Sequence, residues 1–234
     1  MFLYINGDSH SAGAEAANTY CFANDDFKYR HLGRKAHPDN LLVSYGSILA
    51  KKLNAKLICD AESSSSNARI IRTTRDFLKY TTPDIIVIGW ATWEREEWNH
   101  NGIYYQVTAG GTDIVPDDLK KLYKDWVIRI TNQYALNEIR QHEIIWNFHL
   151  ELEEKCIPHF FFNTYNTFAH VRLNNLQQYD WGPNYLDPYS EAFTYYNWLK
   201  DRGCQTVNSQ SYHFGIDAHE KWAEFLLPHL TRLL

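Results

Sequence analysis

The chain has 234 residues, of which 23 are Lys or Arg and 28 are Asp or Glu, so its formal net charge is −5 with histidine neutral. Nonspecific nucleic-acid binding needs a basic excess that this composition lacks, and a hydrophobic fraction of 44% is typical of a soluble globular protein rather than a disordered one. No apolar stretch approaches the roughly 18 residues of a membrane span, and the amino terminus carries no signal-peptide pattern. We therefore expect one cytoplasmic domain over residues 1–234, with no nucleic-acid or membrane partner.

The first 80 residues predict two units in which a strand precedes a helix. The apolar run Phe2–Ile5 predicts a strand that ends at the turn signal Asn6-Gly7-Asp8, and apolar positions at helical spacing predict a helix over residues 40–53. Ala55–Cys59 predicts a second strand, and a helix is expected over residues 70–78.

The rest of the chain continues this alternation. Ile85–Gly89 is a β-branched run typical of a strand buried on both faces, and a long polar and aromatic loop is expected over residues 90–115. One long helix or two successive helices are predicted between Pro116 and Leu152, then a strand at Phe160–Phe162, and a last helix that starts between Gly215 and Asp217 and is kinked at Pro228.

Strands that alternate with helices favour a three-layer α/β/α sandwich with a mainly parallel, flavodoxin-like sheet. In such sheets ligands bind beyond the carboxyl ends of the strands. The polar segments that follow the predicted strands are therefore the first places to look for a site, and they begin at Asn6, Glu62, Gly89 and Asn163.

Two segments at opposite ends of the chain carry side chains suited to nucleophilic catalysis. Gly7-Asp8-Ser9 directly follows the first predicted strand, and His213 stands just before the last predicted helix. A serine hydroxyl becomes a good nucleophile when an imidazole accepts its proton, and the same imidazole can then protonate the leaving group. Folding would have to bring the two segments together.

These two segments resemble the first and last sequence blocks of the SGNH hydrolase superfamily, also called GDSL esterases and lipases. The resemblance implies that Ser9 is the nucleophile, that His213 is the base, and that His219 matches a second histidine of the closing helix. It spans essentially the whole chain in the order of its elements, but only the two terminal blocks are specific.

The acidic member of the family's catalytic triad is not at its expected position. The resemblance places it three residues before the histidine, where this chain has Gln210. An amide oxygen can orient the ring without stabilising its charge, which implies a Ser-His dyad or a degenerate triad. Asp217 is the nearest other carboxylate, although its place at a helix start also suits a capping residue.

The oxyanion hole that the resemblance implies is also altered. Its donors would be the backbone N–H groups of Ser9 and Ser64, the latter in a segment that lacks the family's glycine, and a side chain from Thr92 or Asn67. The family's asparagine position holds Ala91.

The segment after the third predicted strand offers substrate-binding candidates. Trp90 and Trp93 would form a platform for a sugar or a flat acyl group, and Arg95 would bind an anion; the alternative is that the tryptophans pack on the body of the protein. Further aromatic residues that would complete such a cleft are Tyr165, Tyr179, Trp181, Tyr185, Tyr189, Tyr195 and Tyr196.

The sequence predicts neither a metal site nor a cofactor. His142 and His149 are seven residues apart and Asp217 and His219 only two apart, spacings that do not place both side chains of a pair on one ion. No Gly-rich phosphate loop is present. Four dispersed cysteines are expected as reduced thiols.

The function predicted from these observations is hydrolysis of an ester, in particular of an acyl or acetyl group on a carbohydrate, with a small-molecule or glycan ester as substrate. One alternative is a non-catalytic glycan-binding module with the same fold, since the expected acid and asparagine are absent. The other is an acyltransferase that uses the same serine. The sequence does not specify an oligomeric state.

Overall fold

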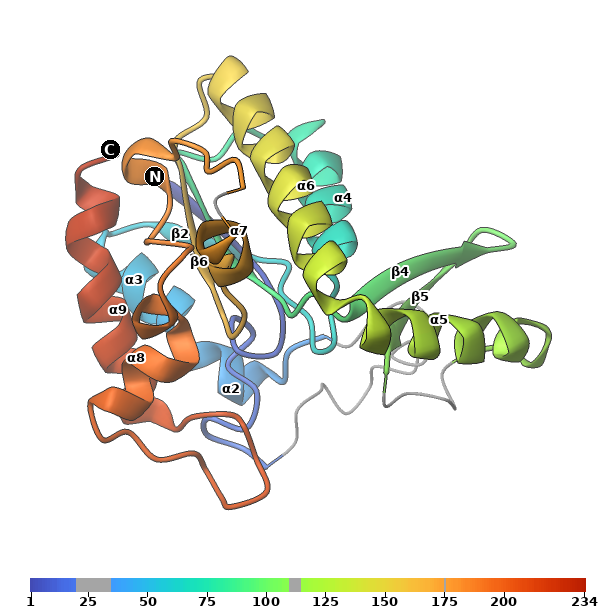
Figure 1. The fold of residues 1–234 in the computed structure, drawn as a ribbon. Coiled ribbons are helices and arrows are strands. Elements are labelled where there is room, and N and C mark those ends of the chain that lie inside the picture. Colours follow the sequence, from blue (N-terminus) through green and yellow to red (C-terminus); the bar gives the residue numbers. More distant parts are fainter. Residues whose placement is uncertain (20–34, 110–114, 175) are drawn as a thin grey trace.

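Four parallel strands form the central sheet of the computed structural model, which describes residues 1–19, 35–109, 115–174 and 176–234. The strands are β1 (Phe2–Asn6), β2 (Lys56–Cys59), β3 (Ile85–Trp90) and β6 (His159–Asn163), in the order β2-β1-β3-β6 (Figure 1). Ile5 of β1 pairs with Cys59 on one side and Val87 on the other. The first strand is thus internal, and all four strands end at the same edge of the sheet.

Helices cover both faces because successive strand residues point to opposite sides. Leu3 and Ile5 belong to the core under α3 (Tyr45–Lys52), α8 (Tyr195–Asp201) and α9 (Ile216–Thr231). Tyr4 belongs to the opposite core with α4 (Asn67–Leu78), α6 (Tyr134–Glu154) and α7 (Ala169–Leu173). Figure 1 shows these two helical layers on either side of the sheet. The predicted three-layer α/β/α sandwich is confirmed.

The segment predicted as a loop over residues 90–115 contains a β-hairpin. Strands β4 (Arg95–His100) and β5 (Ile103–Thr108) are antiparallel and are joined by Asn101 and Gly102, both at positive φ. This hairpin and α5 (Lys120–Asn132), preceded by the 3₁₀ turn η1 (Asp117–Leu119), enclose a small core of their own. In Figure 1 they project from the body of the molecule.

Two helical predictions are refined. The helix expected over residues 40–53 is two helices, α2 (Pro38–Leu42) and α3, because the Ser44 hydroxyl accepts the Ser47 N–H and starts a new helix. The helical pattern between Pro116 and Leu152 is divided between α5 and α6. The remaining short turns are η2 (Gly182–Asn184) and η3 (Glu191–Phe193), and Pro228 lies inside α9.

Two glycines allow β1 and β3 to end against each other. A Cβ on Gly7, whose φ is +155°, would lie 2.2 Å from the Ser11 Oγ and 2.8 Å from the carbonyl oxygen of Gly89. A Cβ on Gly89 would lie 2.7 Å from the Phe162 ring. Gly7 meets the backbone of β3 and Gly89 meets the buried Phe162 ring, so a side chain at either position would clash. Their close approach fixes the turn that carries Ser9.

Among the described residues, no helix has the length and apolar character needed to cross a membrane. Cys59, Cys156 and Cys204 are free thiols, and Cys21 lies outside the described residues.

Candidate active site

Ser9 lies in a tight turn just beyond the carboxyl end of β1. The Ala12 N–H donates to the Asp8 carbonyl at 3.0 Å and the Ala14 N–H donates to the Ser9 carbonyl at 2.9 Å. The Asp8 side chain is fully buried and accepts the His10 N–H at 3.0 Å. These bonds hold the Ser9 side chain at the edge of the sheet.

His213 reaches Ser9 from the other end of the chain. The Val207 N–H donates to the His213 carbonyl at 2.9 Å, and Thr206 bridges Phe214, so the loop before α9 is fixed by its own backbone. His213 Nε2 lies 2.8 Å from Ser9 Oγ. This is the distance at which an imidazole accepts a hydroxyl proton. The structure therefore joins the two segments singled out in the sequence.

The carboxylate on the far side of the His213 ring is Glu15. Its Oε2 lies 2.5 Å from His213 Nδ1. The carboxylate can only accept a hydrogen bond when ionised, so Nδ1 carries the proton and Nε2 is free to accept from Ser9. Ser9, His213 and Glu15 thus form a continuous line of hydroxyl, imidazole and carboxylate, the arrangement of a serine-hydrolase triad.

The two sequence candidates for this carboxylate position are corrected. Gln210 is exposed and its backbone N–H donates to Asn208 Oδ1 at 2.9 Å, so its side chain does not orient the ring. Asp217 lies in the first turn of α9, with a side chain 68% exposed and 3.8 Å from the Lys221 ammonium. Neither contacts His213, because Glu15 occupies that place.

Ser211 connects Glu15 to the loop of His213. Its hydroxyl donates to Glu15 Oε2 at 2.5 Å and accepts the His213 backbone N–H at 2.9 Å. Burial opposes ionisation of Glu15, but the hydrogen bonds from Ser211 and His213 outweigh it and lower the pKa of Glu15 below its usual value. The carboxylate is therefore ionised at neutral pH, the form that stabilises an imidazolium.

Two further histidines border this line and are held neutral. His10 is 4% exposed, its ring centroid lies 5.0 Å from that of His213, and burial, followed by the charge of His213, lowers its pKa well below the usual value. His219 is buried in α9, where its Nδ1 accepts the Tyr45 N–H, and burial lowers its pKa to about 3. Neither ring adds a positive charge beside His213 at neutral pH.

An open pocket of about 490 Å³ lies directly over Ser9 and His213. Its volume is within the usual range for small-molecule sites. None of the described residues that line it is aliphatic. They are Ser9, His10, Ser63, Ser64, Thr92, Glu94, Arg95, Tyr165, Asn166, Tyr212 and His213. The residues of this lining are called the open pocket below.

The predicted oxyanion residues separate into two groups. Ser64 and Thr92 line the open pocket together with Ser9. Ser64 has a φ of +66° in a turn closed by the Ser65 N–H on the Glu62 carbonyl, so it adopts the conformation that a glycine would favour. Asn67 is corrected: its side chain is buried and bonded to both backbone groups of Ala91, so it joins α4 to the end of β3 instead of facing the pocket.

The predicted substrate platform is corrected as well. Trp90 is fully buried with its ring 5.0 Å from that of Phe161, and Trp93 is 1% exposed and stacks on Phe168 at 4.9 Å. Both tryptophans pack on the body of the protein. Arg95 does line the open pocket, where its Nη1 lies 3.0 Å from the Asp8 carboxylate, so its charge is already paired there.

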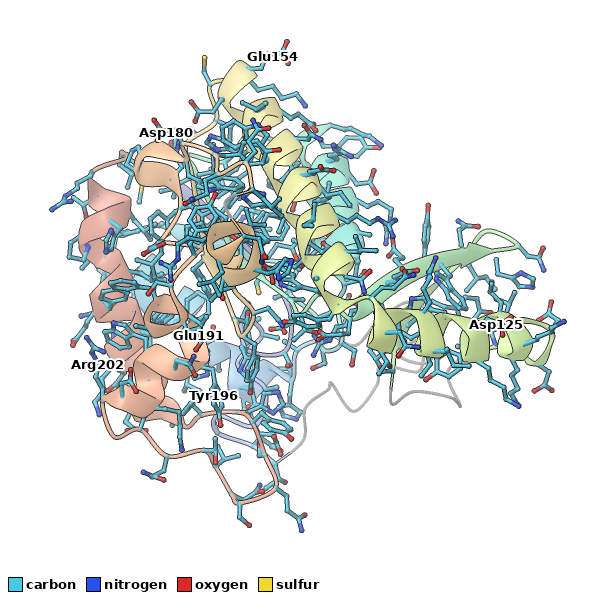
Figure 2. All side chains as sticks on the ribbon, in the orientation of Figure 1. Asp125, Glu154, Asp180, Glu191, Tyr196 and Arg202 are labelled. Atoms are coloured by element: carbon cyan, nitrogen blue, oxygen red, sulfur yellow. The ribbon has the colours of Figure 1, made fainter. Side chains whose placement is uncertain are left out.

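Most of the other aromatic candidates lie away from the pocket. Tyr165 lines it and stacks on Tyr196, which Figure 2 labels. Tyr195 is in the core beneath α9. A second group packs between α6 and the chain after α7 and is called the closed aromatic cluster below. It comprises His142, Trp146, Tyr179, Trp181, Tyr185 and Tyr189.

Sequence reasoning missed Glu15, His10 and Tyr212. Glu15 is the one acidic residue between Asp8 and Asp25, which is a usable signal in a stretch of small residues that follows Ser9. Its φ of +61° and the loop of His213, nearly 200 residues away, decide where it points. His10 directly follows Ser9, so its place at the pocket wall could be inferred from the sequence. Nothing local marks Tyr212.

No family model and no curated protein matches the chain. Among solved structures, it is similar to one described as the crystal structure of TesA, with 10% identity, full coverage of both chains and a TM-score of 0.52. It is also similar to a protein assigned to the G-D-S-L lipolytic family from Desulfitobacterium hafniense, at 12% identity, covering 100% and 99% of the two chains with a TM-score of 0.44. A third structure, the acetyl xylan esterase AlAXEase, is 10% identical, with 97% and 98% coverage and a TM-score of 0.47.

Of these three similarities, the one to TesA exceeds a TM-score of 0.5, and at 10% identity it concerns the fold. The chain therefore has the fold of the SGNH hydrolases, as its terminal blocks indicated.

Proposed function

We propose that the protein is a serine esterase that removes a short acyl group from a polar alcohol. The observation that carries the proposal is the line of hydrogen bonds from Ser9 Oγ through the His213 ring to Glu15, which ends in the open pocket. The outer member of the line, Glu15, is ionised at neutral pH because hydrogen bonds from Ser211 and His213 lower its pKa.

In the first step Ser9 Oγ attacks the ester carbonyl while its proton passes to His213 Nε2. Glu15 stabilises the imidazolium that forms and keeps the ring oriented through Nδ1. The ring then gives the proton to the leaving alcohol, and the acyl group remains on Ser9 as an ester. Water, activated by the same ring, hydrolyses that ester and restores the site.

The negative charge on the carbonyl oxygen needs donors in place before the reaction starts. We infer that the backbone N–H groups of Ser9 and Ser64 and the Thr92 hydroxyl provide them, since all three residues border the open pocket. The positive φ of Ser64 supports this role, because it shows the local backbone held in an uncommon conformation beside the nucleophile.

The lining of the pocket favours a short acyl chain on a polar alcohol, such as an acetyl group on a sugar. A long acyl chain gains affinity from aliphatic walls, and the described lining contains none. Tyr165 and Tyr212 offer ring faces, and Asn166, Glu94 and Arg95 offer polar groups suited to hydroxyls.

The proposal is tested by hydrolysis of p-nitrophenyl acetate by the wild type and by Ser9→Ala. We expect kcat/KM to fall by roughly 10⁴–10⁶-fold in the variant. Ser209→Ala, an exposed serine in the loop before His213, is the matched control and should retain activity. Equal rates in all three proteins would refute the esterase.

The proposed preference for a short acyl chain is tested by comparing substrates with short and long acyl groups. We expect p-nitrophenyl acetate and acetylated glucose to be better substrates than p-nitrophenyl decanoate by at least tenfold in kcat/KM. A preference for the decanoate would leave the esterase intact and overturn only the short-chain assignment. Among the alternatives, Glu15 weakens the binding module, which rested in part on a missing acid.

A further inference from the structure

Three potential metal ligands converge at the end of the sheet opposite the open pocket. His149 and Glu153 lie one turn apart on α6, and His159 is the first residue of β6. One ligand atom from each lies within 4.8 Å of the others. In Figure 2 the label of Glu154, the neighbour of Glu153, is at the far end of α6, well separated from Tyr196 beside the pocket.

The two imidazoles direct nitrogen atoms at each other. His149 Nδ1 lies 2.8 Å from His159 Nε2, and His159 Nδ1 lies 2.8 Å from the carbonyl oxygen of Ile157. A carbonyl only accepts, so His159 Nδ1 carries its proton and Nε2 presents a lone pair. Metal-binding histidines are commonly fixed in this way, with the other ring nitrogen donating to a backbone carbonyl.

The third group supplies charge and access to solvent. Glu153 Oε1 lies 4.0 Å from His159 Nε2, accepts the Asn184 side-chain amide at 2.9 Å, and belongs to a side chain that is 52% exposed. The two rings are 4% and 0% exposed. An ion at this point would therefore meet two buried nitrogens on one side and a carboxylate and water on the other.

We propose that His149, Glu153 and His159 bind a divalent transition-metal ion of the Zn²⁺ class. Two imidazoles and one carboxylate are a common zinc donor set, with water as the fourth ligand. Tetrahedral Zn–N bonds of about 2.0–2.1 Å place two nitrogens about 3.3–3.4 Å apart, so the rings need to separate by only about half an ångström. Binding moves the His149 proton from Nδ1 to Nε2, which keeps the ring neutral, and ties the end of α6 to the start of β6.

This site differs from the pairs that the sequence offered. His142 and His149 are two turns apart on one helix. In the proposed site the second imidazole is that of His159, which comes from β6. Its role is independent of the proposed esterase, and its test does not use activity.

The test uses the full chain after treatment with a chelator, in thermal unfolding with Zn²⁺ and in visible absorption with Co²⁺. We expect Zn²⁺ at 100 times its Kd to raise Tm by roughly 5–10 °C. We also expect Co²⁺ to give the intense visible bands of a tetrahedral site. Glu153→Gln keeps an acceptor for Asn184 and should fold, yet weaken Zn²⁺ binding at least tenfold.

Cys156→Ser is the matched control, because this exposed thiol lies in the same connection and could bind zinc adventitiously. It should leave the Tm rise and the Co²⁺ bands unchanged. His149→Gln should abolish both. A wild type without a Tm rise, or the same rise in Glu153→Gln and His149→Gln, would overturn the proposal and leave the two rings as a hydrogen-bonded pair.

Discussion

The open pocket and the closed aromatic cluster each contain a hydroxyl in contact with a histidine ring, but the two contacts have different surroundings. In the pocket the Ser9 hydroxyl lies 2.8 Å from His213, and in the cluster the Tyr189 hydroxyl lies 2.8 Å from His142. His213 has Glu15 behind it and a cavity in front. His142 has burial as the sole cause of its lowered pKa, which is about 4.

The two hydroxyls also differ in what else they bind. The Tyr189 oxygen accepts the Tyr179 N–H at 3.0 Å and the Trp181 Nε1–H at 3.2 Å, so its proton is directed to His142 and its lone pairs are used. A hydroxyl beside an imidazole is therefore not enough for a nucleophile. The carboxylate behind the ring and the opening in front of the hydroxyl make the difference.

Among the tests of this comparison, the largest effect is expected from changing that carboxylate. Glu15→Gln removes the charge and can hold the ring in the wrong tautomer, so kcat/KM for p-nitrophenyl acetate should fall by roughly 10²–10⁴-fold. Gln210→Ala and Asp217→Asn should each stay within threefold of the wild type. If Gln210→Ala were as damaging as Glu15→Gln, the assignment of Glu15 would be wrong.

The second prediction separates core aromatics from pocket aromatics. Trp93→Ala should lower the free energy of unfolding by about 3–5 kcal/mol, because it empties a buried site against Phe168. Tyr165→Ala should instead raise KM severalfold with a smaller loss of stability. Urea denaturation and steady-state kinetics of both variants measure the contrast. A pure KM effect in Trp93→Ala would restore the platform hypothesis.

The third prediction concerns the stability of the fold at low pH. The unfolded chain protonates His219 below about pH 6.5, whereas burial in the fold delays protonation to about pH 3. Stability should therefore be lost as the pH falls below about 6.5, by about 2–3 kcal/mol at pH 4.5 from this residue alone. His219→Asn, whose side-chain oxygen can still accept the Tyr45 N–H, should show a shallower loss in urea denaturation between pH 7 and 4.5. An unchanged slope would argue against a neutral, buried His219.

The smallest effect is expected in the closed aromatic cluster. Tyr189→Phe removes a hydroxyl that joins three groups, so it should cost about 1–3 kcal/mol of stability. Activity should remain within twofold, in contrast to Ser9→Ala. A large loss of activity with unchanged Tm would show that the cluster communicates with the pocket.

The sheet could be predicted because its signals are local. The run Ile85–Ile88 and the run Phe160–Phe162 are apolar on both faces, and each proved to be a buried parallel strand. The β4–β5 hairpin escaped because Arg95–His100 is polar on both sides, although Asn101-Gly102 is a strong hairpin turn. The sequence predicts one helix in place of α2 and α3, because the hydrophobic spacing continues across the Ser44 cap.

The site was predictable in part for the same reason. Ser9 and His213 stand at element boundaries that the pattern reveals, and the fold brings them into contact. Three other features depend on packing between distant segments. They are the contact of Glu15 with His213, the burial of Trp90 and the hydrogen bonds between Asn67 and Ala91. The sequence shows that a side chain has the right chemistry for a site. It does not show whether that side chain is already buried or hydrogen-bonded elsewhere in the fold.

Glu15 lies six positions after Ser9, so a single short loop holds both ends of the proton line, and the distant segment contributes the ring between them and the Ser211 hydroxyl that bonds Glu15. A one-residue insertion within that loop would displace Ser9 and Glu15 relative to each other, whereas the stretch before His213 has to deliver one imidazole and the Ser211 hydroxyl. A sequence search that requires an acid near the final histidine would pass over a chain whose carboxylate comes from the first loop.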